Sequence, residues 1–146
     1  MADRDTFQLG GDAAHIYEEQ KVPAMFRPLA ELTPEHVKIQ ERDRVLDAAC
    51  GTGIVARLEA GKVGSSGGVT GVDLNAEMIE AAKQYSSNAS VKIDWHQTDV
   101  TDLPFPESSF DIVFCQQGLQ YFPEKLAALS ELQRVLVPGG AFILTV

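Results

Sequence analysis

The sequence predicts an α/β fold in which helices cover a mainly parallel, doubly wound sheet. An apolar segment at 44–48 leads through a glycine-bearing turn at 49–53 into a helical pattern from Ile54. Strand, tight turn and helix form the first half of a βαβ unit. Further strand and helix patterns alternate to residue 146. Because crossovers between parallel strands are right-handed, this alternation places helices on both faces of one sheet.

The N-terminal part, 1–42, is expected to be a helical segment that lies against a core at 43–146. Residues 1–11 are expected to be frayed, and a short helix should follow at about 12–20. Pro23 is expected to interrupt that helix, after which an apolar helical pattern resumes. A second helix start is expected at Thr33, where a hydroxyl precedes a proline and an acid.

The first half of the core follows from short apolar runs that end at turn residues. A strand is expected at 43–48 and a helix at 53–60. A polar turn rich in Gly and Ser ends that helix and precedes a strand at 69–73. Asn75 is expected to cap the next helix, 76–85, whose apolar residues fall on one face.

The second half of the core begins with an alternating pattern at 91–95, which is typical of an edge strand. A loop with two prolines leads to an apolar strand at 110–115. A helix is expected over 123–136, opened by its proline. The turn at 138–140 should end that helix and precede a last strand at 141–146.

Composition limits the classes of function. The chain has 146 residues, 45% of them hydrophobic, so it can form a core of ordinary domain size. Its net charge of −9 disfavours nucleic acid and anionic membranes as partners. No apolar run is long enough to span a bilayer. Cys50 and Cys115 each end an apolar strand without metal-ligand spacing, which predicts free thiols, no metal and a cytoplasmic location.

The turn at 51–56 fits two kinds of ligand. It matches the dinucleotide pattern G-x-G-x-x-[GA], and Asp73 follows Gly53 at the distance of a ribose-binding acid. Asp47, however, ends the first strand, where a carboxylate would repel a pyrophosphate and attract an ammonium. S-adenosylmethionine has that ammonium, a carboxylate for the N–H groups of the loop, and a ribose for Asp73.

Several segments in order along the chain resemble the class I S-adenosylmethionine-dependent methyltransferases. Val45 to Gly53 resembles their first motif, and Gly71 to Asn75 resembles their second. The segments at 98–105 and 110–113 resemble the third and fourth motifs, and 134–140 resembles the turn before strand five. The chain as a whole resembles the small-molecule group that includes quinone-biosynthesis methyltransferases.

This resemblance implies a Rossmann-like sheet of order 3-2-1-4-5. The family's sheet has seven strands, so we expect a C-terminally truncated chain that lacks the last two. The open edge of strand five would then favour a homodimer. The resemblance also implies that the N-terminal segment helps to cover the cofactor through Tyr17, Met25 and Phe26, although simple packing between helices is an open alternative.

The resemblance implies roles for the residues around the first turn. Asp47 would hold the ammonium directly or through water, or else cap the following helix. Gly51 and Gly53 would bring the backbone close to the methionine part of the cofactor. Ala49 stands where many members have glycine and is expected to narrow the loop only slightly. Asp73 would accept hydrogen bonds from both ribose hydroxyls, or cap the next helix.

Further roles implied by the resemblance fall on three later loops. Leu74 would cover one face of the adenine or pack in the core. Asp99 would accept from the adenine amino group and the Val100 N–H would meet a ring nitrogen, the alternative at Asp99 being a surface Asx-turn. Gln116 and Gln117 would line the acceptor pocket beside the sulfonium, or only bond loop backbone.

Three functions therefore stay open. The first is methyl transfer from S-adenosylmethionine to a small-molecule acceptor contacted by Tyr17, Phe26 and Gln117. The second is a truncated cofactor-binding module without turnover. The third is an NAD-dependent oxidoreductase. The sequence identifies no catalytic base, and none is needed for an acidic or carbon nucleophile.

Overall fold

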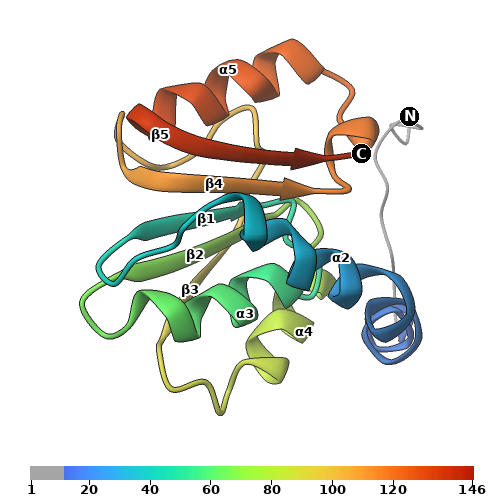
Figure 1. Ribbon diagram of the computed structural model, residues 1–146. Helices are drawn as coiled ribbons and strands as arrows, with labels where there is room; N and C mark the ends of the chain where they lie inside the picture. Colours follow the sequence, from blue (N-terminus) through green and yellow to red (C-terminus); the bar gives the residue numbers. More distant parts are fainter. Residues whose placement is uncertain (1–11) are drawn as a thin grey trace.

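One parallel sheet forms the centre of the molecule in the computed structural model, which describes residues 12–146 (Figure 1). The segment expected to be frayed, 1–11, lies outside the described residues. The strand order is β3-β2-β1-β4-β5, and every neighbouring pair is parallel, which confirms the expected order. The strands are β1 (Arg44–Ala48), β2 (Gly68–Asp73), β3 (Ile93–Gln97), β4 (Phe110–Gln116) and β5 (Leu136–Thr145).

Helices cover both faces of this sheet, so the fold is a three-layer α/β sandwich (Figure 1). The helices of the core are α3 (Ile54–Val63), α4 (Ala76–Tyr85), the 3₁₀ turn η3 (Leu119–Tyr121) and α5 (Lys125–Val135). Buried residues of α3 pack with Val45, Ile112 and Phe114 on one face. Those of α5 pack with Leu46 and Val113 on the other. The alternation of inward residues along β1 and β4 thus builds two separate apolar cores.

The N-terminal segment is one continuous helical run, so the expected interruption at Pro23 is wrong. Its parts are α1 (Ala13–Ile16), the π-helix η1 (Tyr17–Phe26), α2 (Arg27–Leu32) and the 3₁₀ turn η2 (Thr33–His36). Pro23 lies inside η1, where the Arg27 N–H donates to Val22 O, five residues back. A proline supplies no N–H, and the wider π turn accommodates its ring without ending the helix.

A new element does begin at Thr33, as expected, but it is the 3₁₀ turn η2 and not a helix capped by the Thr33 hydroxyl. The Thr33 Oγ1 donates to Leu29 O at 2.7 Å, so this hydroxyl bonds back to the end of α2 instead of capping a new helix. The run then finishes as one 3₁₀ turn. A threonine hydroxyl can bond either way, and only the neighbouring backbone decides which.

The boundaries of β3 and β5 differ most from those expected. β3 lies two residues further along the chain, and β5 already begins at Leu136. Leu136 pairs with Phe110 and Ala141 pairs with Ile112, so the turn at 138–140 is an irregularity inside β5 and not a link before it. Packing against β4 extends the strand through residues that are turn-like by composition.

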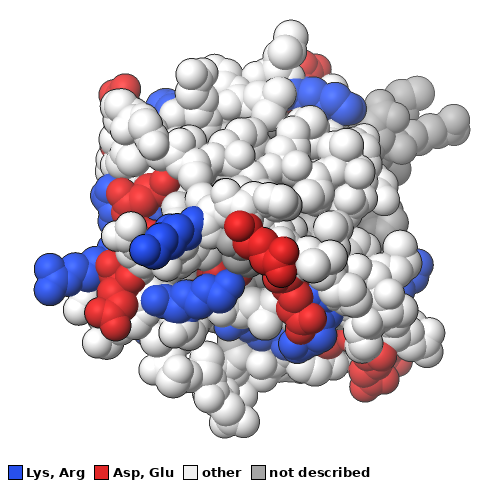
Figure 2. All heavy atoms as spheres, viewed as in Figure 1, with Lys and Arg blue, Asp and Glu red and all other residues white. Residues whose placement is uncertain are grey.

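The surface shows no separate basic area on the face drawn in Figure 2, where Lys and Arg side chains alternate with Asp and Glu. Ion pairs with partly exposed side chains, such as Arg44–Asp111, place opposite charges next to each other on the surface. Among the described helices, none has the length and apolar character that a bilayer crossing requires.

Candidate functional site

A cavity of about 790 Å³ lies where the N-terminal helical segment meets the carboxyl ends of β1, β2 and β4. This edge is where open α/β sheets bind ligands. Eleven of the predicted site residues line it: Tyr17, Met25, Phe26, Ala49, Gly51, Asp73, Leu74, Asp99, Val100, Gln116 and Gln117. The remaining two, Asp47 and Gly53, are not among its lining residues.

The turn after β1 adopts the left-handed backbone that its glycines suggested. Ala49, Gly51 and Gly53 have φ angles of +54°, +56° and +88°. Ala49 is therefore the strained member of the turn, because a Cβ is disfavoured in this region and glycine is not. The Cβ of Ala49 also restricts its neighbour: a Cβ added at Gly118 would lie only 2.7 Å from it.

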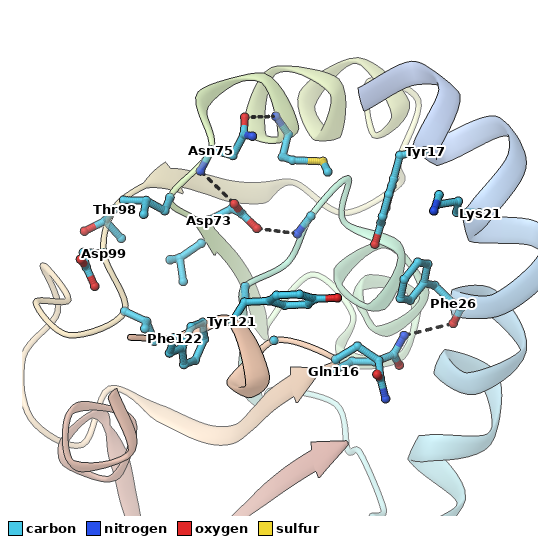
Figure 3. A pocket seen from close by; sticks show the side chains of 18 of the residues that line it. Tyr17, Lys21, Phe26, Asp73, Asn75, Thr98, Asp99, Gln116, Tyr121 and Phe122 are labelled. Carbon is cyan, nitrogen blue, oxygen red and sulfur yellow. Dashed lines mark hydrogen bonds between the residues drawn. The ribbon is translucent and has the colours of Figure 1, made fainter. Parts of the chain in front are cut away.

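Asp73 joins the turn to the next helix. Its Oδ2 accepts from the Gly51 N–H and its Oδ1 from the Asn75 N–H, both at 2.9 Å (Figure 3). Burial raises the pKa of the Asp73 carboxyl, and hydrogen bonds from Asn75, Gly51 and Leu74 partly offset that rise. The cap of α4 is Asn75, as expected, which accepts from the N–H groups of Glu77 and Met78. Asp73 is thus held at the cavity wall, and three hydrogen bonds leave part of the accepting capacity of its carboxylate free.

Asp47 lies below the turn and not in the cavity wall. It is 2% exposed, and its Oδ2 accepts from the Ala56 N–H at 3.1 Å, in the first turn of α3. This is the helix-capping role that the sequence had left as the alternative. Burial raises the pKa of its carboxyl to about 8, with smaller contributions from the charges of Asp73 and Glu59 and an opposing one from the Ala56 hydrogen bond.

Gly53 is a glycine for a reason of packing. A Cβ at this position would lie 2.3 Å from Cη2 of Trp95, and its φ of +88° is also unfavourable for other residues. The Trp95 indole reaches this turn from β3 and anchors its own N–H on Ser86 Oγ at 3.1 Å. The side of Gly53 where a Cβ would point therefore contacts a tryptophan, and the contact of Gly53 with the cofactor stays a prediction.

Asp99 forms the Asx-turn that was the alternative to a ligand contact. Its Oδ1 accepts from the Thr101 N–H at 2.9 Å and from the Thr101 hydroxyl at 2.8 Å. It still lines the cavity, and no hydrogen bond to its Oδ2 is made by the described residues. Val100, which is buried, and Leu74, which is 39% exposed, also line the cavity.

The N-terminal segment forms the opposite wall of the cavity. The rings of Tyr17 and Phe26 stack with centroids 5.1 Å apart, and a Cβ at Gly51 would lie 3.6 Å from the Tyr17 hydroxyl. Gln116 Nε2 donates to Phe26 O at 3.1 Å, while its Oε1 is buried without a partner among the described residues (Figure 3). Gln117 also lines the cavity, and its Oε1 accepts from Gln120.

A buried ion pair beneath this wall was missed by sequence reasoning. Glu18 Oε1 lies 2.5 Å from a nitrogen of Arg57 in α3, and its other oxygen accepts from the Thr52 hydroxyl. Glu18 thus joins the N-terminal segment to the turn after β1. The three residues are far apart in the chain and belong to no local pattern. Other lining residues without a sequence signal are Lys21, Thr98, Tyr121 and Phe122.

Comparison with known proteins gives a consistent result. A family model described as "Methyltransferase domain" matches residues 45–140. The 2-phytyl-1,4-naphtoquinone methyltransferase of Synechococcus elongatus is 43% identical over 102 residues, which cover 67% of this chain and 43% of the relative. The demethylmenaquinone methyltransferase of Staphylococcus epidermidis is 39% identical over 109 residues, with coverage of 73% and 44%. The chain thus spans less than half the length of these curated relatives.

Solved structures share the fold. The YcgJ protein of Bacillus subtilis matches with a TM-score of 0.72 and 31% identity, over 77% of this chain and 47% of that one. A SAM-dependent methyltransferase from Aquifex aeolicus matches with a TM-score of 0.75 over 86% of this chain and 68% of that one. Its identity of 23% supports the fold alone.

Proposed function

The chain belongs to the class I S-adenosylmethionine-dependent methyltransferases of the quinone-biosynthesis type, and on that premise we propose that it transfers a methyl group from S-adenosylmethionine to a small-molecule acceptor. The observation that carries the proposal is the cavity itself. It brings the turn after β1, Asp73 and Asp99 to one wall and the aromatic side chains of Tyr17 and Phe26 to the other.

The residues present fit the cofactor. Gly51 has no Cβ and lies in the cavity wall close to the Tyr17 hydroxyl, so its backbone would contact the methionine part of the molecule. Asp73 would accept from the ribose hydroxyls with its free lone pairs. At the far end, Asp99 and the Val100 N–H would hold the adenine, and Leu74 would cover one face of the ring. S-adenosylmethionine would supply a methyl group already activated by positive sulfur.

Asp47 would act on the ammonium from below the turn. Because it does not line the cavity, we assign it an indirect contact through water, in addition to its bond to Ala56. The carboxyl group of Asp73 lines this end of the cavity, and its ionised form favours a cationic group over a diphosphate. The same argument disfavours a dinucleotide over this turn.

The acceptor would lie among the aromatic side chains. Tyr17, Phe26, Tyr121 and Phe122 come from two separate elements and line the same cavity, which suits a flat apolar ring. Relatives of this chain are named as naphthoquinone and menaquinone methyltransferases, which supports a ring of that kind. The protein would position donor and acceptor in line and exclude water, and an acidic or carbon nucleophile needs no base.

A binding experiment tests this proposal. Calorimetric titration with S-adenosylhomocysteine should give binding, whereas NAD should give none. Asp99→Asn should weaken that binding by about tenfold if the carboxylate accepts from the adenine amino group. Asp102→Asn, in the same loop but outside the cavity lining, is the matched control. A response to NAD alone, or equal affinities of the two variants, would contradict the assignment.

We further propose that the protein is cytoplasmic, has no nucleic-acid partner and self-associates. The net charge of −9 supports the second point. β5 lies at one end of the strand order, with Phe142 and Leu144 exposed, which supports self-association through this edge.

A further inference from the structure

Trp95 of β3 is the single tryptophan of the chain, and its indole packs against the turn after β1 from outside the cavity. The residue is not among those that line the cavity. A Cβ at Gly53 would lie 2.3 Å from Cη2 of the indole, and a Cβ at Gly71 would lie 2.2 Å from Cζ3. The ring therefore fills the space between the turn and β2, and a side chain at either glycine would require the ring to move.

The indole is also fixed at its nitrogen. Its N–H donates to Ser86 Oγ at 3.1 Å, and the Ser86 hydroxyl donates in turn to Ala82 O at 2.7 Å, in the last turn of α4. The backbone of Trp95 is held by its pairing with Gly71 in the parallel ladder between β2 and β3. A different rotamer of Trp95 would break the bond to α4, so the ring stays against Gly53.

Different aromatic side chains pack against the two glycines of the turn. A Cβ at Gly51 would lie 3.6 Å from the Tyr17 hydroxyl, whereas Gly53 meets the indole. Both glycines have a positive φ, and a glycine loses more conformational freedom on ordering than any other residue. Because the glycines themselves favour no single conformation, contacts with neighbouring side chains have to select the one that the turn adopts.

We propose that Trp95 is a positioning residue for the ligand site, which holds the turn after β1 in its binding conformation through Gly53. The proposal rests on the proposed function, in which the backbone of Gly51 contacts the cofactor. A turn that is ordered before the ligand arrives removes an entropic cost of binding. A smaller side chain at position 95 would leave a void beside the turn. The glycines would then sample other conformations, and the ligand would bind more weakly.

Amide hydrogen exchange of the ligand-free protein tests whether Trp95 orders the turn. The N–H of Gly53 donates to Cys50 O and that of Cys50 donates to Val72 O, so both amides report on the turn. Trp95→Leu should speed their exchange by about tenfold. Leu132→Ala, which removes buried packing from α5 in the other apolar core, is the control for a general loss of stability. Equal acceleration at the turn in both variants would overturn the proposal.

Calorimetric titration with S-adenosylhomocysteine tests the effect on the ligand. At a temperature at which all proteins are folded, Trp95→Leu should bind about tenfold more weakly than wild-type protein, and Leu132→Ala should bind as wild-type protein does. Ser86→Ala keeps the ring and removes the anchor of its N–H, so it should weaken binding by a smaller factor. This milder variant also serves if Trp95→Leu does not fold. Ser87→Ala, at the adjacent exposed serine, is its matched control.

The single tryptophan gives a spectroscopic readout of the same coupling. S-adenosylhomocysteine should change the emission of wild-type protein with the dissociation constant that calorimetry gives. Unchanged emission during calorimetric binding, or equal affinities of wild-type protein, Trp95→Leu and Ser86→Ala, would overturn the proposal while the proposed function stands. If wild-type protein binds no S-adenosylhomocysteine, the proposed function is wrong, and faster exchange at the turn in Trp95→Leu would still support the role of Trp95 in holding it.

Discussion

Asp47 is a single residue on which both the stability and the chemistry of the site depend. Its buried carboxylate holds the first turn of α3 through Ala56, directly below the turn that forms the cavity wall. An ionised carboxylate at this depth lacks water, which is why burial raises its pKa to about 8. In the absence of a cationic ligand, the protonated form is therefore favoured below that pH.

This pKa predicts how stability depends on pH. The folded-state pKa of Asp47 lies above the unfolded value of 3.8, so the folded protein binds this proton more tightly than the unfolded chain does. The stability that the proton contributes is fully present below pH 3.8 and is lost as the pH rises toward 8. The free energy of unfolding should fall over this window, by at most about 1.4 kcal/mol per pH unit from this group. Asp47→Asn, whose carbonyl can still accept from Ala56, should reduce the slope. Denaturant unfolding from pH 5 to pH 8 measures it, and an unchanged slope in the variant would refute the role of Asp47.

At the scale of elements, a side chain of the edge strand β3 leaves room only for glycine at positions in two neighbouring segments. Trp95 of β3 lies over Gly71 of β2 and against Gly53 of the turn after β1. A Cβ at Gly71 would lie 2.2 Å from Cζ3 of the indole, so the glycines of the first two motifs make room for this side chain.

Substitution of Gly71 should therefore be destabilising only while the indole is present. We expect Gly71→Ala to cost about 1–3 kcal/mol through overpacking. The same change in a Trp95→Leu background should cost markedly less, because the obstructing atoms are gone. Gly68→Ala in the same strand is the control, since a Cβ there meets nothing within 4 Å. Unfolding of the four proteins of the cycle measures the coupling, and additive effects would show that Trp95 is not the obstacle.

The attachment of the N-terminal segment is a second property of elements. Glu18 pairs with Arg57 where both side chains are mostly buried, at 10% and 17% exposed. Glu18→Ala removes the carboxylate partner of this guanidinium and should reduce the free energy of unfolding by about 2 kcal/mol. Glu19→Ala, next to it on the exposed side, should have little effect. Equal effects in chemical denaturation would mean that the pair does not hold the segment in place.

At the scale of the whole molecule, the sheet ends in an apolar strand. Phe142 and Leu144 of β5 pair with Val113 and Cys115 of β4 on the face that α5 covers, yet both are about two-fifths exposed. Exposed strands of this kind pair readily with other chains. We expect the wild-type chain to form dimers whose fraction rises with concentration. Phe142→Lys together with Leu144→Lys should give monomers in light scattering after gel filtration, and dimers that persist in this variant would place the interface elsewhere.

The sequence by itself determined the strand order, through its resemblance, and the positions of most core elements. These depend on local signals: apolar runs that end at turns, and the Asn75 cap, which acts only two and three residues away. It also identified residues on several sides of the cavity, such as Asp73 and Asp99, because strands that run in parallel bring the residues after them to one edge.

Only the tertiary structure decided the contacts between distant segments. Glu18 meets Arg57 39 residues further on, and Gln116 reaches Phe26 across 90. Asp47 faces a helix instead of the cavity, Gly53 faces an indole, and Pro23 stays within a helix that packs against the core. In each case the residue type allows two outcomes of similar free energy, and the partner that packs against it selects one. Partners brought together by folding leave no periodic pattern in the sequence, so the sequence could not predict them.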